Sequence, residues 1–594
     1  MPRLPVCFLL AVLCSFAASE DGAALFQKNC ALCHRPGAEN RTPLPEALRR
    51  LTNASIVSAL ESGVMKTQGL ALTAAERQAV ADFLVPRSSA VKMDAPVPNA
   101  CATASPALTG LDGWNGWGVD LANSRFQSSK NAGLRASDIP NLKLKWAFGI
   151  PDASSMYGQP TAVNGRLFFG SGNGTVYSLD AATGCLYWTF RAPVQVRTPI
   201  EIAKRPDGRY AAFFGDGSAN VYAVDAQTGQ QLWKTQVEDH KLAGITGAPK
   251  YYNGRVFVTV RSGSEEMIAA QTKYACCTFR GSVVALDAKS GEKVWKTYTI
   301  PDAPVVVSKS SEGTDRFGPS GAGVWSSPTI DPKRKALYVG TGNNYSDPPT
   351  KYGDAIIAFD LETGSMRWAK QMNEDVWNFS CSQPVKANCP DKPDRDTDIG
   401  TSPILHKLAN GKELLVFGQK SGYVRAVDPD KRGEIVWEKQ IGKGGALGGI
   451  MWGLAADATQ VYAPLSDINP GPAGGLFAFK IATGEQAWSV PPAELACKGK
   501  PGCNAAQMAP ATAMDGVVFS GSLDGHLRAH ATGDGKLIWD YDTLRDFETV
   551  NGVPGHGGSL NATGPTLAHG MLFVNSGYSQ LTGMKGNVLL AFSK

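Results

Sequence analysis

Alternating apolar and polar positions recur along most of the chain, each time followed by a turn and a second segment that ends in Trp. The clearest copy runs from Gly281 to Trp295 and has the skeleton Ala-x-Asp-x-x-x-Gly-x-x-x-Trp. A period of two is typical of a β-strand with one buried face, and Gly marks a turn between two strands. Each copy therefore predicts the outer strand pair of a four-stranded antiparallel sheet, and its recurrence predicts a repeat protein.

The repeats predict an eight-bladed β-propeller. Seven copies end at Trp188, Trp233, Trp295, Trp368, Trp437, Trp488 and Trp539. Trp146 ends one more comparable strand, and residues 587–592 form a lone apolar strand at the C-terminus. Pairing these two ends would complete one blade and remove exposed sheet edges. Because a bare blade needs roughly 40–45 residues, the longer spacing between Trp233 and Trp437 predicts loop insertions there, where a ligand would bind.

The N-terminal part has a different pattern, with helical periodicity in residues 22–29, 56–62 and 74–84. Thr73 and Glu76 fit a capping box at the start of the last helix. Between the helices lies Cys30-Ala-Leu-Cys33-His34. In this motif two thiols attach haem c covalently and the His binds the iron, although Cys-x-x-Cys alone would also fit a thiol redox pair. We predict a small all-α cytochrome c domain at residues 20–90, a linker at 91–112 and the propeller at 113–594.

The sixth ligand of the haem iron is predicted from the same domain. Met65 is its one Met, and a thioether raises the potential of haem iron, as suits an electron acceptor. The alternative is that Met65 only fills space in the core.

Charge and the N-terminus bear on location and partners. The formal net charge of the 594 residues is +5, and Lys and Arg are interspersed with Asp and Glu, which argues against nucleic acid or an anionic membrane as main partner. Arg3 precedes an apolar run from Val6 to Ala17, so residues 1–19 are predicted to be a cleaved signal peptide. No other stretch is long and apolar enough for a membrane span. The protein is expected in the periplasm.

Export changes the interpretation of the cysteines, because disulfides form in oxidising compartments. Eight of the twelve remain after the signal peptide and the haem motif are set aside. Neighbouring positions predict the pairs Cys276–Cys277, Cys381–Cys389 and Cys497–Cys503, and elimination leaves Cys101–Cys185. Reduced or separately paired thiols are the alternative for Cys276 and Cys277.

The repeats and several motifs resemble the quinohaemoprotein alcohol dehydrogenases, which use pyrroloquinoline quinone (PQQ). The N-terminal position of the cytochrome and the segments 274–282, 549–553 and 574–578 are more narrowly similar to cytochrome-containing polyvinyl-alcohol dehydrogenases. The resemblance implies three cofactors, PQQ, haem c and Ca²⁺. It implies an alcohol substrate, possibly polymeric, and an external electron acceptor such as a soluble cytochrome c.

The resemblance also implies site residues. Ser262-Gly-Ser-Glu265 and Gly340-Thr-Gly-Asn343 match the family's calcium ligands, and hard oxygen ligands suit Ca²⁺. Trp325 matches the residue on which planar PQQ lies, and polar contacts to PQQ are implied for Gln159, Arg197, Thr246 and Lys420. A flat ring closed by Cys276 and Cys277 would stack on PQQ opposite Trp325.

The catalytic base has two candidate alignments. The family's Asp follows a Trp, but Trp377 is followed here by Asn378. Asp396-Thr-Asp398 fits the family's Asp-x-Asp motif and makes residues 378–395 an inserted loop, so we predict Asp396 as the base. The alternative is that both Asp residues cap a turn.

These observations predict a dehydrogenase that oxidises an alcohol, such as the secondary alcohol groups of polyvinyl alcohol, to a carbonyl, with electrons passing from PQQ to haem c and on to an external carrier. An aldose or small primary-alcohol dehydrogenase on the same scaffold is one alternative, and a propeller used only for binding or assembly is another. Fold resemblance alone does not choose the substrate.

Overall fold

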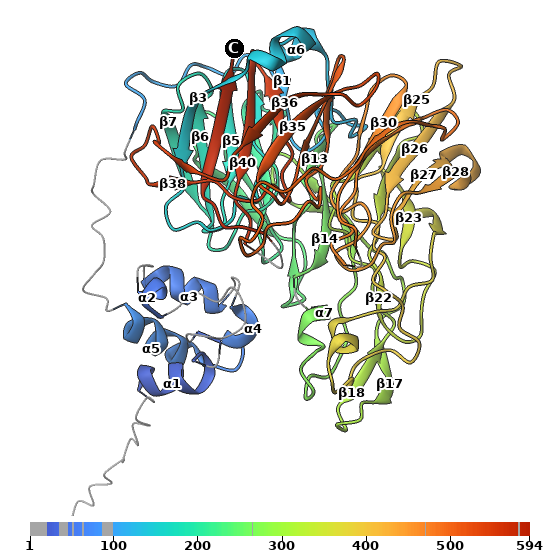
Figure 1. Ribbon diagram of the computed structural model, residues 1–594. Coiled ribbons are helices and arrows are strands. Elements are labelled where there is room, and N and C mark those ends of the chain that lie inside the picture. Colours follow the sequence, from blue (N-terminus) through green and yellow to red (C-terminus); the bar gives the residue numbers. More distant parts are fainter. Residues whose placement is uncertain are drawn as a thin grey trace, which may run out of the picture. The chain divides into compact units, whose positions relative to one another are not determined.

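The computed structural model describes residues 21–34 except 32, 45–49, 53–61, 65–85, and 99–594 except 264, 470 and 580–582. The predicted signal peptide lies outside these residues. The chain divides into two compact units, Met1–Ala95 and Pro96–Lys594, each of which is shown in Figure 1. Within the described ranges, no helix has the length and apolar character that crossing a membrane requires.

The first unit is helical, as predicted. Its helices are α1 (Gly22–Asn29), α2 (Pro45–Leu48), α3 (Asn53–Glu61), α4 (Lys66–Gly69) and α5 (Ala74–Leu84). The capping box at α5 is confirmed, since Thr73 Oγ1 accepts from the Glu76 amide and Glu76 Oε2 accepts from the Thr73 amide. α1 crosses α5 closely at Gly22, where a Cβ would lie 2.1 Å from the Ala79 carbonyl oxygen. The helices thereby close around one small apolar core.

The second unit is the predicted eight-bladed β-propeller. The first four blades are β4 (Thr161–Val163), β5 (Arg166–Gly170), β6 (Thr175–Asp180), β7 (Leu186–Arg191); β8 (Glu201–Lys204), β9 (Tyr210–Gly215), β10 (Asn220–Asp225), β11 (Gln231–Gln236); β13 (Lys250–Tyr252), β14 (Arg255–Ser262), β15 (Ser282–Asp287), β16 (Lys293–Tyr298); β20 (Thr329–Asp331), β21 (Ala336–Gly340), β23 (Ala355–Asp360) and β24 (Met366–Gln371). The next three are β25 (Ile404–Lys407), β26 (Glu413–Gly418), β27 (Tyr423–Asp428), β28 (Glu434–Gln440); β29 (Ala455–Ala456), β30 (Gln460–Pro464), β31 (Leu476–Lys480), β32 (Gln486–Val490); β33 (Thr512–Met514), β34 (Val517–Gly521), β35 (His526–Ala531) and β36 (Leu537–Asp542).

The eighth blade closes the ring with strands from both ends of the unit. It contains β39 (Thr566–Ala568), β40 (Met571–Ser576), β41 (Val588–Ser593) and, beside β41, β3 (Lys143–Gly149). β3 and β41 are antiparallel, with Trp146 opposite Ala591. The predicted closure is therefore confirmed, because the first and last strands of the propeller pair within one sheet.

The Trp and Gly of the repeat skeleton meet between neighbouring blades. The indole N–H of Trp233 donates to the Ala288 carbonyl of the next blade at 3.1 Å. Gly291 of that blade has φ +78°, and a Cβ there would lie 2.6 Å from the Trp233 ring. The same bond joins Trp188 to Ala226 and Trp437 to Ile481. The Gly is thus required both by its backbone conformation and by the ring packed on it.

Substitution of Gly291 by Ala is expected to destabilise the propeller by about 2–4 kcal/mol, because the methyl group adds a clash to the cost of a positive φ. Gly313 provides the matched control, since its φ is +79° and no atom lies within 4 Å of a Cβ built there. Gly313→Ala should lose only about 1 kcal/mol. Thermal and denaturant unfolding of both variants measure the difference, and equal losses would contradict the packing role of the Gly.

The predicted insertions between Trp233 and Trp437 are present. They form α7 (Glu265–Ile268), the hairpin of β17 (Val305–Lys309) and β18 (Asp315–Gly318), β22 (Asn344–Ser346) and the 3-10 helix η3 (Phe379–Ser382). Figure 1 shows α7, β17, β18 and β22 gathered at one end of the propeller. Disulfides Cys276–Cys277 and Cys381–Cys389 lie in this region, and Cys101–Cys185 and Cys497–Cys503 lie elsewhere in the unit. All four predicted pairings are thus confirmed.

Candidate active site

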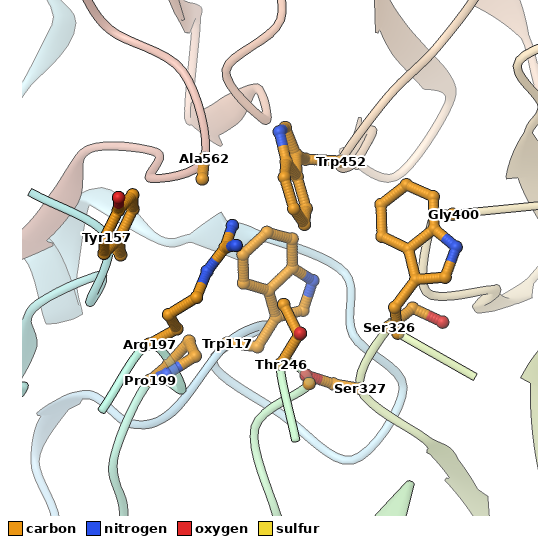
Figure 2. Close-up of a pocket in the computed structure, with 12 residues that line it drawn as sticks. Trp117, Tyr157, Arg197, Pro199, Thr246, Ser326, Ser327, Gly400, Trp452 and Ala562 are labelled. Carbon is orange, nitrogen blue, oxygen red and sulfur yellow. The ribbon is translucent and has the colours of Figure 1, made fainter. Parts of the chain in front are cut away.

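A cavity of about 350 Å³, partly open to solvent, lies where the blades converge (Figure 2). Many of the residues in its wall come from equivalent positions of successive repeats. Six lining residues stand four positions before the first residue of the first strand of a blade, namely Tyr157, Arg197, Thr246, Trp325, Gly400 and Ala562 before Thr161, Glu201, Lys250, Thr329, Ile404 and Thr566. Six of the eight blades therefore each contribute one residue to the wall from the same position of the repeat, and the identity of that residue sets much of the chemistry of the cavity.

Trp117 contributes another wall, and it is held from behind by buried polar side chains. The guanidinium of Arg125 lies 4.5 Å from the centre of the Trp117 ring and donates to the Trp117 carbonyl at 2.7 Å. Gln159 accepts from Arg125 at 2.9 Å and donates to the Trp117 carbonyl at 3.1 Å. Gln159 is fully buried and is not among the residues that line the cavity. Its position supports the wall, whereas the sequence suggested direct contact with a cofactor.

Aromatic rings and one cation form the opposite wall. Trp325 and Trp452 are nearly perpendicular, with ring centres 5.0 Å apart. Gly400 lies against Trp325, since a Cβ on it would be 1.9 Å from the ring. The guanidinium of Arg197 lies 4.7 Å from the Tyr157 ring centre and 5.5 Å from that of Trp452, as Figure 2 shows. Flat apolar walls and a guanidinium suit a planar anionic ligand.

Two more predicted residues lie at this cavity. Thr246 lines it and accepts a hydrogen bond from Nε of Arg261. Burial lowers the pKa of Arg261 to about 10, so the group is still charged at neutral pH. Lys420 lies 5.5 Å from the centre of the Trp325 ring. Arg197 is thus the cation in the cavity wall, and Arg261 and Lys420 lie close to residues of that wall.

Lys420 joins the two carboxylates of the Asp-x-Asp motif. Its Nζ donates to Asp396 Oδ1 at 2.9 Å and to Asp398 Oδ2 at 2.8 Å, and all three side chains are buried. Burial acts to lower the pKa of Lys420, but the two carboxylate charges outweigh it and raise that pKa. The lysine is therefore a fixed cation.

The buried carboxylate of Asp396 has a strongly shifted pKa. Burial raises the pKa of Asp396 well above its ordinary value. The charges of Asp398 and Glu266 add to this rise, and the charge of Lys420 opposes it. Lys420 binds Oδ1, and no hydrogen bond to Oδ2 is found among the described residues. A raised pKa brings a carboxylate closer to the range in which general bases are effective.

The adjacent residues Glu265 and Glu266 have different surroundings in the structure. Glu265 is fully buried, and its oxygens accept from the amides of Thr278 and Phe279 at 2.9 and 2.7 Å and from the Tyr274 hydroxyl at 2.9 Å. These donors belong to the loop that carries the vicinal cysteines. Both carboxylate oxygens of Glu265, the predicted calcium ligand, are thus hydrogen-bonded to that loop.

Glu266 has the opposite environment. Its side chain is half-buried, and no donor bonds its carboxylate among the described residues. Burial and the charge of Asp398 raise the pKa of Glu266 to about 7, while Lys420 and Arg261 act to lower it. A carboxylate that is poorly compensated beside other acids is one that a divalent cation would stabilise.

Asn343, the other predicted calcium ligand, is bonded to Asp398 of the Asp-x-Asp motif. Its amide N–H donates to Asp398 Oδ1 at 2.8 Å, and its Nδ2 donates to the Trp377 carbonyl at 2.7 Å. Neither bond uses the side-chain oxygen, which is the atom that would bind a cation. Among the described residues no three or more His, Cys, Asp and Glu side chains are grouped as a metal site, so a cation here would be held by an amide oxygen and few carboxylates.

The vicinal cysteines and Asn378, the residue of the rejected alignment, lie away from the cavity wall. Cys276 and Cys277 are buried in an apolar cluster with Phe279 and Tyr345 and are not among the lining residues. Asn378 caps η3, where its Oδ1 accepts from the Ser380 amide at 2.9 Å and its Nδ2 donates to two carbonyls. Because these bonds occupy both ends of the Asn378 amide, Asn378 is not a candidate for the base, which favours the alignment that assigns Asp396.

The haem motif lies in the first unit. Cys30 and His34 are buried and Cys33 is exposed. The His34 amide donates to the Cys30 carbonyl at 3.0 Å, so the motif continues the turn that ends α1. Met65 packs against the apolar cluster that includes Cys30. Cys30 and Met65 thus contact one apolar core.

Trp117, Tyr157, Trp452 and Glu266 were not predicted as site residues. The signal that would have found Tyr157 is its fixed offset from the first strand of its blade, which it shares with Trp325. Glu266 carries no such signal, because only the fold distinguishes it from Glu265.

Comparison with known sequences gives two near full-length relatives. A polyvinylalcohol dehydrogenase from Pseudomonas sp. is 41% identical over 98% of this chain and 96% of its own, and one from Sphingopyxis sp. (strain 113P3) is 39% identical over 96% and 92%. Residues 114–395 match the family model of the glucose/ethanol/alcohol dehydrogenase β-propeller domain, and residues 17–84 match that of the cbb3-type cytochrome c oxidase subunit III. Residues 420–548 and 473–592 match the model of the outer membrane protein assembly factor BamB.

Solved structures show the same fold at low identity. A quinohemoprotein alcohol dehydrogenase from Comamonas testosteroni superposes with a TM-score of 0.58 at 18% identity, covering 81% of each chain. The ADHIIG enzyme from Pseudomonas putida HK5 gives 0.60 at 17% identity, covering 84% of this chain and 83% of its own.

Proposed function

Because this chain belongs to the polyvinylalcohol dehydrogenase family of PQQ- and cytochrome-dependent alcohol dehydrogenases, we propose that it oxidises secondary hydroxyl groups, such as those of polyvinyl alcohol, to carbonyls in the periplasm. We propose that the electrons pass through haem c to an external carrier. The observation that carries the proposal is 41% identity over 98% of the chain to a polyvinylalcohol dehydrogenase. The four disulfides agree with an oxidising compartment.

The residues of the cavity fit the family's cofactors. Trp325 and Trp117 provide flat walls, and Arg197 in the cavity wall, with Arg261 behind Thr246, provides cations for the carboxylates of PQQ. Glu266 and Asn343 would hold Ca²⁺, because both can direct a side-chain oxygen to it. When bound, PQQ supplies a two-electron acceptor and Ca²⁺ supplies a Lewis acid.

Asp396 would accept the hydroxyl proton of the alcohol on Oδ2. Lys420 fixes the carboxylate through Oδ1, and its charge opposes the rise in the pKa of Asp396 that burial causes. Asp398 balances Lys420 and holds the amide of Asn343. The same salt-bridge network therefore orients the base and the residue proposed to bind the metal.

Adjacent substitutions test the assignment of the metal ligand. Glu266→Gln is expected to weaken Ca²⁺ binding to the PQQ-free protein by about 100-fold, because a charged oxygen ligand is replaced by a neutral one. Glu265→Gln should change Ca²⁺ affinity less than fivefold and instead lower the melting temperature, because it loosens the loop held by Thr278 and Phe279. Calorimetric titration with Ca²⁺ measures the affinities. Loss of Ca²⁺ binding in Glu265→Gln alone would assign the metal to Glu265.

A substrate panel tests the proposed function. The holoenzyme, loaded with PQQ and Ca²⁺, is expected to oxidise polyvinyl alcohol and small secondary alcohols with a kcat/KM at least about tenfold higher than for primary alcohols or aldoses, with carbonyl formation and haem reduction followed together. A preference for primary alcohols or aldoses would contradict the proposed substrate. Oxidation of alcohol without haem reduction would contradict the proposed electron route.

A further inference from the structure

A second pair of carboxylates lies buried behind the Asp-x-Asp motif. Asp354 precedes β23 and Asp375 follows β24, and both side chains are fully buried. They come from two segments 21 residues apart that the fold brings together. The catalytic role assigned to Asp396 uses neither of them.

Both carboxylates bind Thr397, the residue between Asp396 and Asp398. The Thr397 amide donates to Asp375 Oδ2 at 2.6 Å. Its hydroxyl donates to Asp354 Oδ2 at 2.7 Å and lies 3.1 Å from Asp375 Oδ2. Asp396 and Asp398, on either side of Thr397, both accept from Lys420 Nζ. Fixing Thr397 therefore restrains the backbone that presents both carboxylates to Lys420.

The same pair is bonded to the segment of the proposed metal ligand Asn343. The Asp354 amide donates to the Gly342 carbonyl at 3.0 Å. The Asp375 carbonyl accepts from the Asn344 amide at 3.2 Å and from its side-chain Nδ2 at 3.1 Å. Asp354 and Asp375 thus join the segment of the metal ligand to the segment of the base.

Asp354 and Asp375 lie close enough for each to shift the pKa of the other. Each carboxylate leaves one oxygen, Oδ1, without a donor among the described side chains and amides. Two ionised carboxylates in contact away from water repel strongly, and a proton between them removes both problems. Burial and the neighbouring acid raise the pKa of Asp354 well above its ordinary value. Burial also raises the pKa of Asp375, although the bond from the Thr397 amide opposes that rise.

Asp396 needs such support, because its backbone has φ +63°. The left-handed region is open to Asp but costs roughly 1 kcal/mol relative to the ordinary regions. The Thr397 bonds fix the next peptide and so hold this conformation.

We propose that Asp354 and Asp375 are positioning residues that share one proton and, through Thr397, hold Asp396 in the orientation in which it accepts the substrate proton. The inference rests on the proposed role of Asp396 as base. It assigns no ligand to the acidic pair itself.

Matched substitutions of Asp354 test the shared proton. Asp354→Asn supplies an amide N–H where the proton lies and should keep kcat within about threefold of wild type. Asp354→Ala removes both the bond to Asp375 and the bond to Thr397, and it should lower kcat about 30-fold or more while KM for alcohol changes less than threefold. The deuterium isotope effect on kcat with a carbinol-deuterated alcohol should rise in Asp354→Ala, because the chemical step becomes slower. PQQ and haem contents and the melting temperature serve as folding controls.

Thr397 gives an independent pair of variants if Asp354→Ala does not fold. Thr397→Ser keeps the hydroxyl and should resemble wild type, whereas Thr397→Val keeps the shape and should lose activity as Asp354→Ala does. Crystal structures of the four variants report the distance from Lys420 Nζ to Asp396 Oδ1, which is 2.9 Å in the wild type. That contact should be lost only in Asp354→Ala and Thr397→Val.

The structural readout separates this inference from the proposed function. If Asp396→Asn is fully active, Asp396 is not the base, yet the Lys420–Asp396 contact still reports positioning. Wild-type kcat with an intact contact in Asp354→Ala or Thr397→Val would overturn the inference. Equal loss of activity in Asp354→Asn and Asp354→Ala would overturn it as well, because the shared hydrogen bond would then be irrelevant.

Discussion

Asp396→Asn is expected to lower kcat for alcohol oxidation by about 10³-fold, because an amide cannot accept the hydroxyl proton and general-base catalysis contributes roughly 10²–10⁴-fold. The substitution is nearly isosteric, and Lys420 retains its bond to Asp398. The contents of PQQ and haem should therefore stay at wild-type levels. Rapid mixing of the variant with alcohol, followed through cofactor absorbance, isolates the chemical step.

Asp398→Asn is the control for Asp396, since both carboxylates bind the same Lys420 ammonium. Loss of the Asp398 charge weakens the hold on Lys420 and on the Asn343 amide without removing the base, so kcat should fall about tenfold or less. Two outcomes would contradict the assignment. Normal turnover of Asp396→Asn would leave both Asp residues with a turn-capping role, and a larger loss in Asp398→Asn would make Asp398 the base.

The double variant Cys30→Ser/Cys33→Ser is expected to lose covalently bound haem completely, because serine hydroxyls do not add to haem vinyl groups as thiols do. Transfer of electrons to a soluble cytochrome c should then cease, while substrate still reduces PQQ in the propeller. Haem staining on a denaturing gel measures attachment. Parallel assays with cytochrome c and with a dye that oxidises reduced PQQ directly separate the two steps.

Met65→Ala is the milder companion of that variant. The haem remains attached through Cys30 and Cys33, but loss of the thioether should lower the haem reduction potential. A potential equal to that of wild type would show that Met65 only packs in the core. Unchanged turnover with cytochrome c in the haem-free protein would exclude haem as the electron route.

The architecture was predictable because the repeat encodes it locally. Each copy of the skeleton carries its own strand alternation, its turn Gly and its Trp, so a single copy such as Gly281–Trp295 specifies a strand pair without knowledge of the rest. Closure between β3 and β41 followed from the excess of one strand at each end. Short sequence separation likewise made Cys381–Cys389 and Cys497–Cys503 predictable.

The site was predictable only where a motif or a family resemblance fixed a residue. Asp396, Lys420, Trp325, Arg197 and Thr246 do converge on one region of the propeller. Gln159 has the polar character expected of a cofactor contact, yet it is buried behind Trp117. Polarity in a sequence does not say whether a side chain will find its partners in a ligand or within the protein.

The sequence by itself determined the two domains, the eight blades, the haem motif and three disulfide pairs, because each is encoded in residues close together or in a regular period. The fourth pair, Cys101–Cys185, spans 84 residues and followed only by elimination. Only the tertiary structure decided that Glu265 is hydrogen-bonded within the protein while the pKa of Glu266 is raised by burial and a nearby acid. It also brought Asp354 and Asp375 into hydrogen bonds with Thr397. These choices depend on donors that come from other blades or loops. A carboxylate's role is set by which charges and donors surround it once it is buried, and the folded chain alone brings those groups together.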